Sequence, residues 1–167
     1  QDTIYTGREQ TRNYFENCYI NGTTDYIFGP STVWFEACQL HCKRDSYITA
    51  ASTPEYVKYG YIFNNCKITA EASVGKMYLG RPWRQYGMTL FMHCDMGGFI
   101  RPEGWHNWGK TENEQCARYY EFENSGEGAA SDKRVFWSKQ LSKKEAKEYT
   151  LENVMGDWNP QACKIVL

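Results

Sequence analysis

The chain of 167 residues has a net charge of −1 and is 41% hydrophobic and 23% charged. These values are typical of one globular domain with a sizeable core, and they argue against a polybasic protein that binds nucleic acid. No apolar run is long enough to predict a membrane span, and no signal peptide is recognisable. Because the first residue is Gln1 rather than Met, we expect a processed or truncated start.

Two aspartates lie in turn-rich segments near the start, Asp2 in QDTIY and Asp25 in NGTTDYIFG. Taken alone, such residues more often bond nearby backbone N–H groups. However, the sequence has no GxSxG serine motif, no GxGxxG and no phosphate loop. His41 and His93 lie in repeat segments where a structural role is expected, and His106 is expected to form a loop hydrogen bond. Carboxylates are therefore the best candidates for chemistry.

Four cysteines each follow a phenylalanine by three residues, in FENC, FEAC, FNNC and FMHC; they are Cys18, Cys38, Cys66 and Cys94. A local pattern that repeats with variable spacing predicts stacked rungs joined by loops of different length. FENS extends the series, with Ser125 in the cysteine position. Exchange of Cys for Ser favours a small inward side chain over a metal ligand.

The residue two positions after each cysteine is apolar: Ile20, Leu40, Ile68 and Met96. It shares a strand face with the cysteine, whereas the phenylalanine has the opposite parity, so the chain must bend between them. Asparagines tolerate such corners, and three repeats have one there: Asn17, Asn65 and Asn124. The pattern predicts an all-β fold, a parallel β-helix with rungs about 4.8 Å apart.

The remaining cysteines, Cys42, Cys116 and Cys163, lie outside the repeat, and the odd total of seven leaves at least one thiol unpaired. We expect the repeated cysteines to be core residues, although stacked thiols could in principle reach disulfide geometry. His41 precedes Cys42, but no second pair at ligand spacing completes a zinc site. We expect no metal and no organic cofactor.

A helical signal comes only near the end, in LSKKEAKEY at 141–149. Ser142 is a candidate N-cap, and Glu145 three residues later completes a capping box. The prediction is therefore a β-helix over residues 1–140 that carries the site, followed by a short α-helix and tail over 141–167 that pack on it.

Three segments in this order, QDTIY (1–5), TTDYIFG (23–29) and YLGRPWR (78–84), resemble the signature segments of the pectin methylesterase family, and IRPEGWHNW (100–108) and VFWSKQLS (135–142) resemble its bacterial members. The resemblance implies a right-handed parallel β-helix and hydrolysis of methyl esters in homogalacturonan, with release of methanol. It also implies a secreted or periplasmic protein that acts on methyl-esterified pectin. We expect a monomer, or a chain completed by an upstream segment.

Carried over residue by residue, the resemblance makes Asp25 the nucleophile, Asp2 the general acid and then base, and Gln1 an oxyanion-hole donor. Arg81 would hold Asp25. The chemistry is consistent: a guanidinium fixes and keeps ionised a carboxylate that must attack an ester, and a second carboxyl can give its proton to departing methanol. A side-chain amide can stabilise the tetrahedral oxyanion.

The resemblance also implies substrate-binding residues, which are Trp83, Phe28, Tyr26, Thr24 and Arg84. Of Tyr26 and Phe28, one is expected to face the cleft and the other the core. Two alternatives stay open: a β-helix that binds polysaccharide without turnover, and an esterase of this fold that acts on another ester or a thioester. Two departures from the family are an absent upstream segment, which would supply a second glutamine, and a longer polar loop at 7–13.

Overall fold

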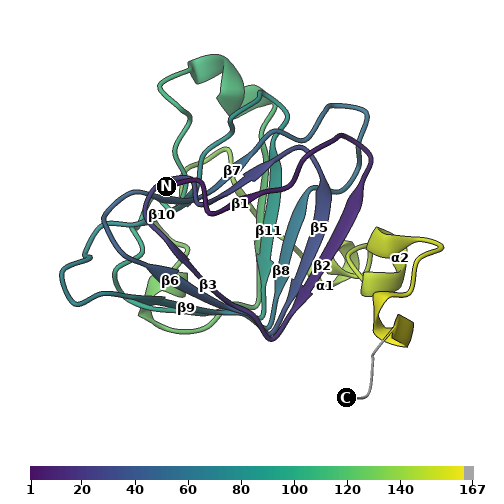
Figure 1. Ribbon diagram of the computed structural model, residues 1–167. Coiled ribbons are helices and arrows are strands. Elements are labelled where there is room, and N and C mark those ends of the chain that lie inside the picture. The colour runs from purple at the N-terminus through teal and green to yellow at the C-terminus, as the bar shows by residue number, and fades with distance from the viewer. Residues whose placement is uncertain (164–167) are drawn as a thin grey trace.

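A computed structural model describes residues 1–163, in which the chain coils into a right-handed parallel β-helix (Figure 1). All strand pairs are parallel, as the repeat predicts. The first sheet contains β1 (Ile4–Tyr5), β4 (Ile27–Gly29), β7 (Tyr47–Ala51) and β10 (Tyr78–Gly80). The second contains β2 (Arg12–Glu16), β5 (Thr32–Glu36), β8 (Tyr61–Asn64), β11 (Met88–Met92), β13 (Arg118–Phe122) and β14 (Lys139–Gln140). The third contains β3 (Tyr19–Gly22), β6 (Gln39–Cys42), β9 (Lys67–Ala70) and β12 (Asp95–Met96).

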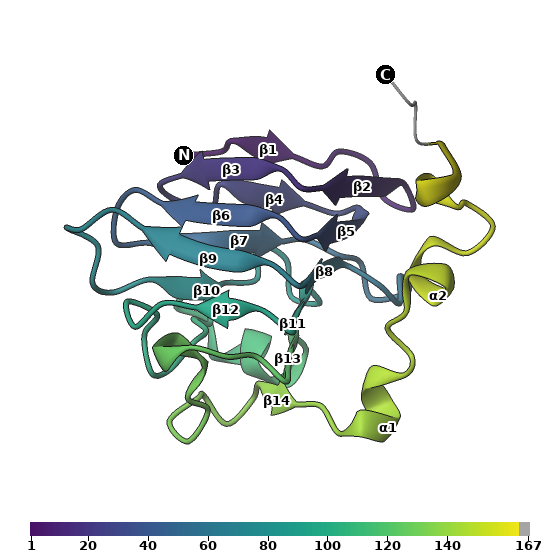
Figure 2. The same cartoon turned by 90° about the horizontal axis from the view of Figure 1, so that it is seen from below.

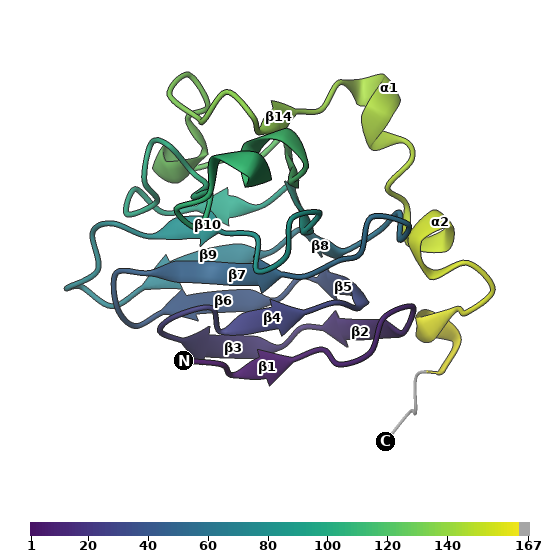
Figure 3. The same cartoon turned by 90° about the horizontal axis from the view of Figure 1, so that it is seen from above.

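Short helical elements follow or interrupt the coil: η1 (Thr111–Gln115), η2 (Glu127–Ala129), α1 (Lys143–Ala146), α2 (Leu151–Met155) and η3 (Pro160–Cys163). The capping box of Ser142 and Glu145 is present, but the helix that it opens, α1, lasts only four residues. The sequence reading missed α2, which Thr150 caps. Both helices lie alongside the rungs (Figures 2 and 3). Residues 164–167 of the predicted tail lie outside the described part of the chain.

The helices cover the outer face of the second sheet with apolar side chains. Val154 and Met155 of α2 belong to the same buried cluster as Trp34, Ile62 and Leu90, one from each of three successive strands of that sheet. This packing supplies the burial that a helix of four or five residues needs, because such short helices are not stable alone in water. In residues 1–163, no helix is sufficiently long and apolar to cross a membrane.

The phenylalanines of the repeat form a stack inside the coil. Ring centroids are 5.1 Å apart between Phe15 and Phe35, and 4.4 Å apart between Phe35 and Phe63 and between Phe63 and Phe91. The rings are close to parallel, within 10° of one another. Strand register explains the stack, since these four residues are direct partners in β2, β5, β8 and β11.

The repeated cysteines also form a stacked row, as predicted. The register of the third sheet aligns the residues that follow them, Tyr19, Gln39, Lys67 and Asp95. Thiols of the row donate to carbonyl groups of the preceding rung, for example Cys94 to Phe63 at 3.4 Å. All cysteines whose side chains the structure describes are free thiols. The row therefore serves as core packing.

The corner between the second and third sheets is made by one left-handed residue on each rung, and these are Asn17, Ala37, Asn65, His93 and Glu123. Two of the three predicted corner asparagines are confirmed, and Asn124 is wrong. The fifth rung is offset by one residue from the pattern: Glu121 pairs with Phe91, and Ser125 pairs with Asp95 rather than continuing the cysteine row. The backbone register between β11 and β13 sets this offset. Comparison of the FENS sequence with the four cysteine repeats does not reveal it.

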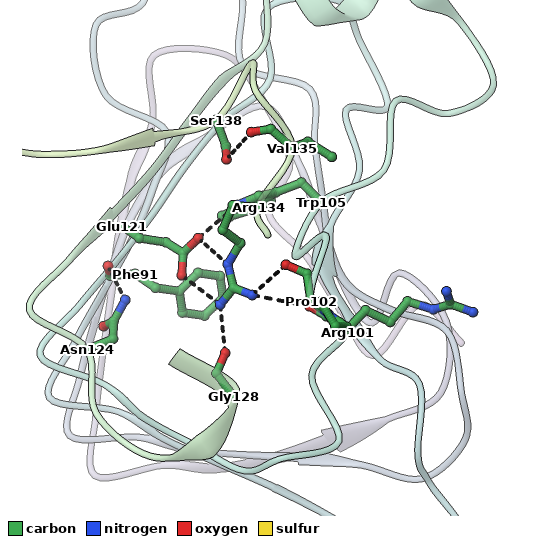
Figure 4. A network of polar contacts seen from close by, with 10 residues as sticks. All are labelled: Phe91, Arg101, Pro102, Trp105, Glu121, Asn124, Gly128, Arg134, Val135 and Ser138. Carbon is green, nitrogen blue, oxygen red and sulfur yellow. Dashed lines mark hydrogen bonds and ion pairs between the residues drawn. The ribbon is translucent and has the colours of Figure 1, made fainter. Parts of the chain in front are cut away.

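Glu121 occupies the position that follows the last ring of the phenyl stack. A buried ion pair offsets the free-energy cost of burying its charge there. Glu121 is only 1% exposed, and Arg134 donates to both of its oxygens at 2.8 and 3.1 Å. The same guanidinium donates to the carbonyls of Arg101, Pro102 and Gly128, as Figure 4 shows. Trp105 donates to Glu121 at 3.2 Å. Since a buried charge is costly without partners, this network fixes the 100–105 segment against the coil.

We predict that Phe63→Ala lowers the free energy of unfolding by about 3–5 kcal/mol, because it opens a cavity between two stacked rings. Urea denaturation would measure the change. Phe136→Ala is the matched control: the Phe136 side chain is 86% exposed, so its truncation should stay within about 0.5 kcal/mol. Equal losses in the two variants would contradict the assignment of the phenyl stack as the core.

Candidate active site

Asp2 and Asp25 lie side by side on successive rungs. Ile4 pairs with Ile27, and the same 23-residue step separates the two aspartates. The N–H of Asp2 donates to the Thr24 carbonyl at 3.3 Å. Both aspartates have left-handed backbone, with φ of 54° and 48°. That conformation is uncommon outside glycine, and such residues cluster at functional sites. One turn of the coil thus brings the two carboxyl groups to one edge of the first sheet.

Arg81 binds the Asp25 carboxylate through two parallel hydrogen bonds. Nε donates to Oδ1 at 3.0 Å and Nη2 donates to Oδ2 at 2.7 Å. The guanidinium lies between two aromatic rings, 3.8 Å from the centroids of both Tyr47 and Trp108. Because a planar guanidinium stacks on aromatic faces while it binds a carboxylate in the fork geometry, the orientation of Asp25 is closely fixed.

Two glycines allow the chain to reach this arrangement. A Cβ on Gly80, the residue before Arg81, would lie 2.0 Å from Oγ1 of Thr49, so only glycine fits where β10 meets β7. A Cβ on Gly22 would lie 2.3 Å from Cβ of Tyr26. Gly22 therefore makes room for the Tyr26 ring directly after Asp25.

A cleft of about 250 Å³ contains the two carboxyl groups, and its lining residues are Gln1, Asp2, Asp25, Phe28, Ala50, Trp83 and Trp108. The side-chain amide of Gln1 donates to Asp2 at 3.4 Å. Phe28 and Trp83 meet edge to face with centroids 5.9 Å apart, and Trp83 is 38% exposed. The cleft thus combines a fixed carboxylate, a second carboxyl, an amide donor and exposed aromatic surface.

Three predicted substrate-binding residues do not line this cleft. Tyr26 is wrong as a cleft residue: it is fully buried, its hydroxyl lies 3.6 Å from the Cys42 sulfur, and burial raises its pKa well above the ordinary value. Tyr26 precedes β4 and is buried, whereas Phe28 lies within β4 and lines the cleft. Residues two positions apart would share a face in a regular strand, so strand alternation does not explain this difference. The Thr24 hydroxyl accepts hydrogen bonds from Ser46 and Arg44, and the Arg84 guanidinium lies 5.4 Å from the Trp83 centroid.

The sequence reading did not assign Tyr47, Ala50 or Trp108 to the site. One turn of the coil leads from Asp25 to Tyr47, just as one turn leads from Asp2 to Asp25, so the spacing of the rungs is the signal that points to Tyr47. Trp108 comes from a loop, and no spacing rule gives its position. Ala50 pairs with Phe28, and its small side chain borders the cleft beside the exposed aromatic rings.

His106 helps to hold Tyr47 and Trp108, the two aromatic residues that lie on either side of the Arg81 guanidinium. Its Nδ1 accepts the Trp108 N–H at 3.0 Å, and its ring packs against Tyr47 and Tyr78 at 5.4 and 5.3 Å between centroids. The predicted loop hydrogen bond is thus confirmed. Burial, and then the charges of Arg81 and Arg101, lower the pKa of His106. The neutral imidazole is the form that accepts the Trp108 hydrogen bond. In residues 1–163, no group of three or more His, Cys, Asp or Glu side chains could hold a metal ion.

The fold and cleft define a β-helix with a carboxylate-based site, and comparisons with known proteins identify the family. A family model described as Pectinesterase matches residues 1–157. Pectinesterase 31 of Arabidopsis thaliana is 44% identical over 147 residues, which cover 87% of this chain and 46% of the relative. The chain belongs to the pectinesterase family, and it spans about half the length of the curated relatives that it matches.

Solved structures support the same family assignment. A pectin methylesterase from carrot superposes with a TM-score of 0.85 at 31% identity and covers 92% of this chain and 52% of its own. A pectin methylesterase in complex with a hexasaccharide has a TM-score of 0.77 at 28% identity, covering 93% of this chain and 53% of its own. The right-handed parallel β-helix and the family are therefore confirmed, whereas the bacterial type and the individual site residues stay predictions.

We predict that His106→Asn weakens the pH dependence of stability. Because the folded state lowers the pKa of His106, the unfolded chain binds this proton more readily. The stabilisation is therefore full above the ordinary pKa of about 6.5 and is lost as the pH falls through the lower pKa of the folded state. Asparagine can still accept the Trp108 hydrogen bond but does not titrate.

Urea midpoints at pH 7 and pH 5 would measure this effect. The decline on acidification should be smaller in His106→Asn than in the wild type. An unchanged decline in His106→Asn would show that another group accounts for acid sensitivity.

Proposed function

We propose that this chain hydrolyses methyl esters of pectin to a free carboxylate and methanol, with Asp25 as the nucleophile. The observation that supports this most strongly is the carboxylate of Asp25, held at both oxygens by Arg81 and placed next to Asp2 in an open cleft. Each carboxylate oxygen has two lone pairs, so the bonds to Arg81 leave one free to attack.

In the first half-reaction, an oxygen of Asp25 forms a bond to the ester carbonyl carbon, and the carbonyl electrons move to its oxygen. The Gln1 amide donates a hydrogen bond to this oxyanion, a type of contact typically worth about 3 kcal/mol. Asp2 then gives its proton to the methoxy oxygen as the carbon–oxygen bond breaks. Methanol leaves, and an anhydride between Asp25 and the uronate remains.

In the second half-reaction, Asp2 is ionised and takes a proton from water, whose oxygen attacks the acyl carbon. The bond to Asp25 breaks, and the carboxylate of Asp25 returns to its place on Arg81. The sum is one ester and one water converted to one carboxylic acid and one methanol. Trp83 and Phe28 offer aromatic faces on which sugar rings can stack beside the carboxylates.

The relatives support the substrate class. The matched structures are pectin methylesterases, and two of them were solved with a hexasaccharide. The proposal extends to a protein that acts on pectin outside the cytoplasm, secreted or periplasmic, without a metal or organic cofactor. A second candidate function is not favoured by any contact in the cleft.

The test is methanol release from highly methyl-esterified pectin. Asp25→Asn should lower the rate by on the order of 10³-fold or more, because the amide is a poor nucleophile and loses the ion pair with Arg81. Asp132→Asn, an exposed carboxylate outside the cleft, is the matched control and should retain the wild-type rate. Full activity in Asp25→Asn would refute the nucleophile, and a silent wild-type chain would refute the proposed activity of this chain.

A further inference from the structure

One guanidinium on the second sheet binds carbonyl oxygens instead of a carboxylate. Arg118, the first residue of β13, donates to the carbonyl of Tyr86 from Nε at 3.1 Å and from Nη2 at 2.8 Å. Its Nη1 donates to the carbonyls of Val57 and Lys58 at 2.7 and 3.3 Å, and Nη2 also donates to the carbonyl of Pro54 at 3.0 Å. Within residues 1–163, Arg118 forms no ion pair. A single side chain thus holds four backbone carbonyls.

These carbonyls belong to two connections that run from the first sheet to the second. Residues 52–60 join β7 to β8, and residues 81–87 join β10 to β11 on the next rung. The N–H of Arg118 donates to the carbonyl of Gly87 at 3.0 Å, so β13 begins one rung further along and the guanidinium reaches back over both connections. Burial lowers the pKa of Arg118, and the carbonyl dipoles offset the cost of taking this charge out of water. The side chain therefore ties the two connections together.

The 81–87 connection carries Trp83, the exposed indole of the cleft. On the side of the first sheet, the N–H of Trp83 donates to the carbonyl of Ala51 at 3.0 Å. On the side of the second sheet, the bonds from Arg118 hold Tyr86. The two residues between these anchors have exposed side chains. Because a surface loop is mobile unless its polar groups are bonded, the second anchor limits the movement of the indole.

We propose that Arg118 is a positioning residue for polysaccharide binding, because it fixes the 81–87 connection and with it the Trp83 indole on which a sugar ring stacks. The inference deepens the proposed function and rests on it for the identity of the polysaccharide. An aromatic face that is already ordered binds a sugar ring more tightly, since less conformational entropy is lost on binding. Arg118 itself lies outside the residues that line the cleft, so it acts through Trp83.

The reactive carboxylate is held by other contacts. Arg81 binds both oxygens of Asp25, and its guanidinium lies between the rings of Tyr47 and Trp108. Loss of the bonds made by Arg118 should therefore weaken substrate binding and leave the chemical step unchanged. In kinetic terms, KM rises and kcat stays the same.

The experiment is a double-mutant cycle on the binding of a fully de-esterified oligogalacturonate hexamer, which contains no ester to hydrolyse and is titrated by calorimetry. In the wild-type background, Arg118→Ala should weaken binding by roughly three- to tenfold, the value of one aromatic stacking contact. In the Trp83→Ala background, the same substitution should change the affinity by less than about twofold, because its effect passes through an indole that is already absent. A general structural role would weaken binding equally in both backgrounds, and that result would overturn the inference.

Arg118→Lys guards against a loss of folding in Arg118→Ala. Lysine keeps the charge and most of the aliphatic stem, but its single ammonium group lacks the fork that reaches carbonyls of both connections. The variant should therefore fold, with a urea midpoint close to that of the wild type, and should still bind the hexamer more weakly. Wild-type affinity in Arg118→Lys would overturn the inference.

Lys67→Ala is the matched control, since it removes one positive charge from an exposed position on β9 in the third sheet. It should bind the hexamer as the wild type does. Equal weakening in Lys67→Ala and Arg118→Ala would show that net charge explains the loss, and it would overturn the inference. Absence of binding by the wild type would overturn it as well.

Methanol release separates this inference from the proposed function. On highly methyl-esterified pectin, Arg118→Ala should raise KM by roughly three- to tenfold with kcat unchanged, whereas a fall in kcat alone would contradict the positioning role. A silent wild-type chain in which Arg118 and Trp83 remain coupled in hexamer binding would refute the esterase and leave the positioning role standing. Methanol release without that coupling would refute the positioning role and leave the esterase standing.

Discussion

Parallel pairing between successive rungs places the two aspartates and most of the side chains around them. Because each strand hydrogen-bonds to strands one turn before and after it, residues about 20 to 30 positions apart become neighbours in a straight row. The row that begins with Asp2 and Asp25 continues through Tyr47 and Tyr78. A shift of one residue in any pairing would send this row to the other face of the sheet. Inner rows of phenyl rings and thiols hold the register.

The interior and the site are linked through the segment at 100–108. Arg134 and Glu121 fix the start of that segment at the end of the phenyl stack, and Trp105 packs against Phe91 at 5.9 Å between centroids. Three residues later, Trp108 covers the guanidinium of Arg81. The same ion pair that ends the core row thus also positions one wall of the cleft.

Arg81 links two rungs of the coil that are not adjacent. It directly follows β10, yet it binds a carboxylate that precedes β4. The aromatic rings of Tyr47 and Trp108 on either side orient the guanidinium. The geometry of the cleft therefore depends on four rungs and one loop together, which is consistent with motifs that are scattered along the sequence.

The sequence alone determined the coil. Phenylalanine and cysteine at fixed spacing predicted strands, a corner and an inward row, because burial demands the same small set of side chains on each rung. The sequence also predicted that Asp2 and Asp25 lie close together, since one turn of the coil separates them. The capping box of Ser142 and Glu145 was equally readable, because a cap is a local interaction over three residues.

Only the tertiary structure decided the rest. Whether Tyr26 or Phe28 faces the cleft depends on the backbone turn at Asp25, where alternation does not apply. The offset on the fifth rung depends on pairing between β11 and β13, which letter patterns do not encode. Trp108 reaches Arg81 from a loop, and a loop has no periodicity from which to predict its position. Local sequence patterns determine the strands and corners of each rung, whereas contacts between distant rungs and loops determine the geometry of the site.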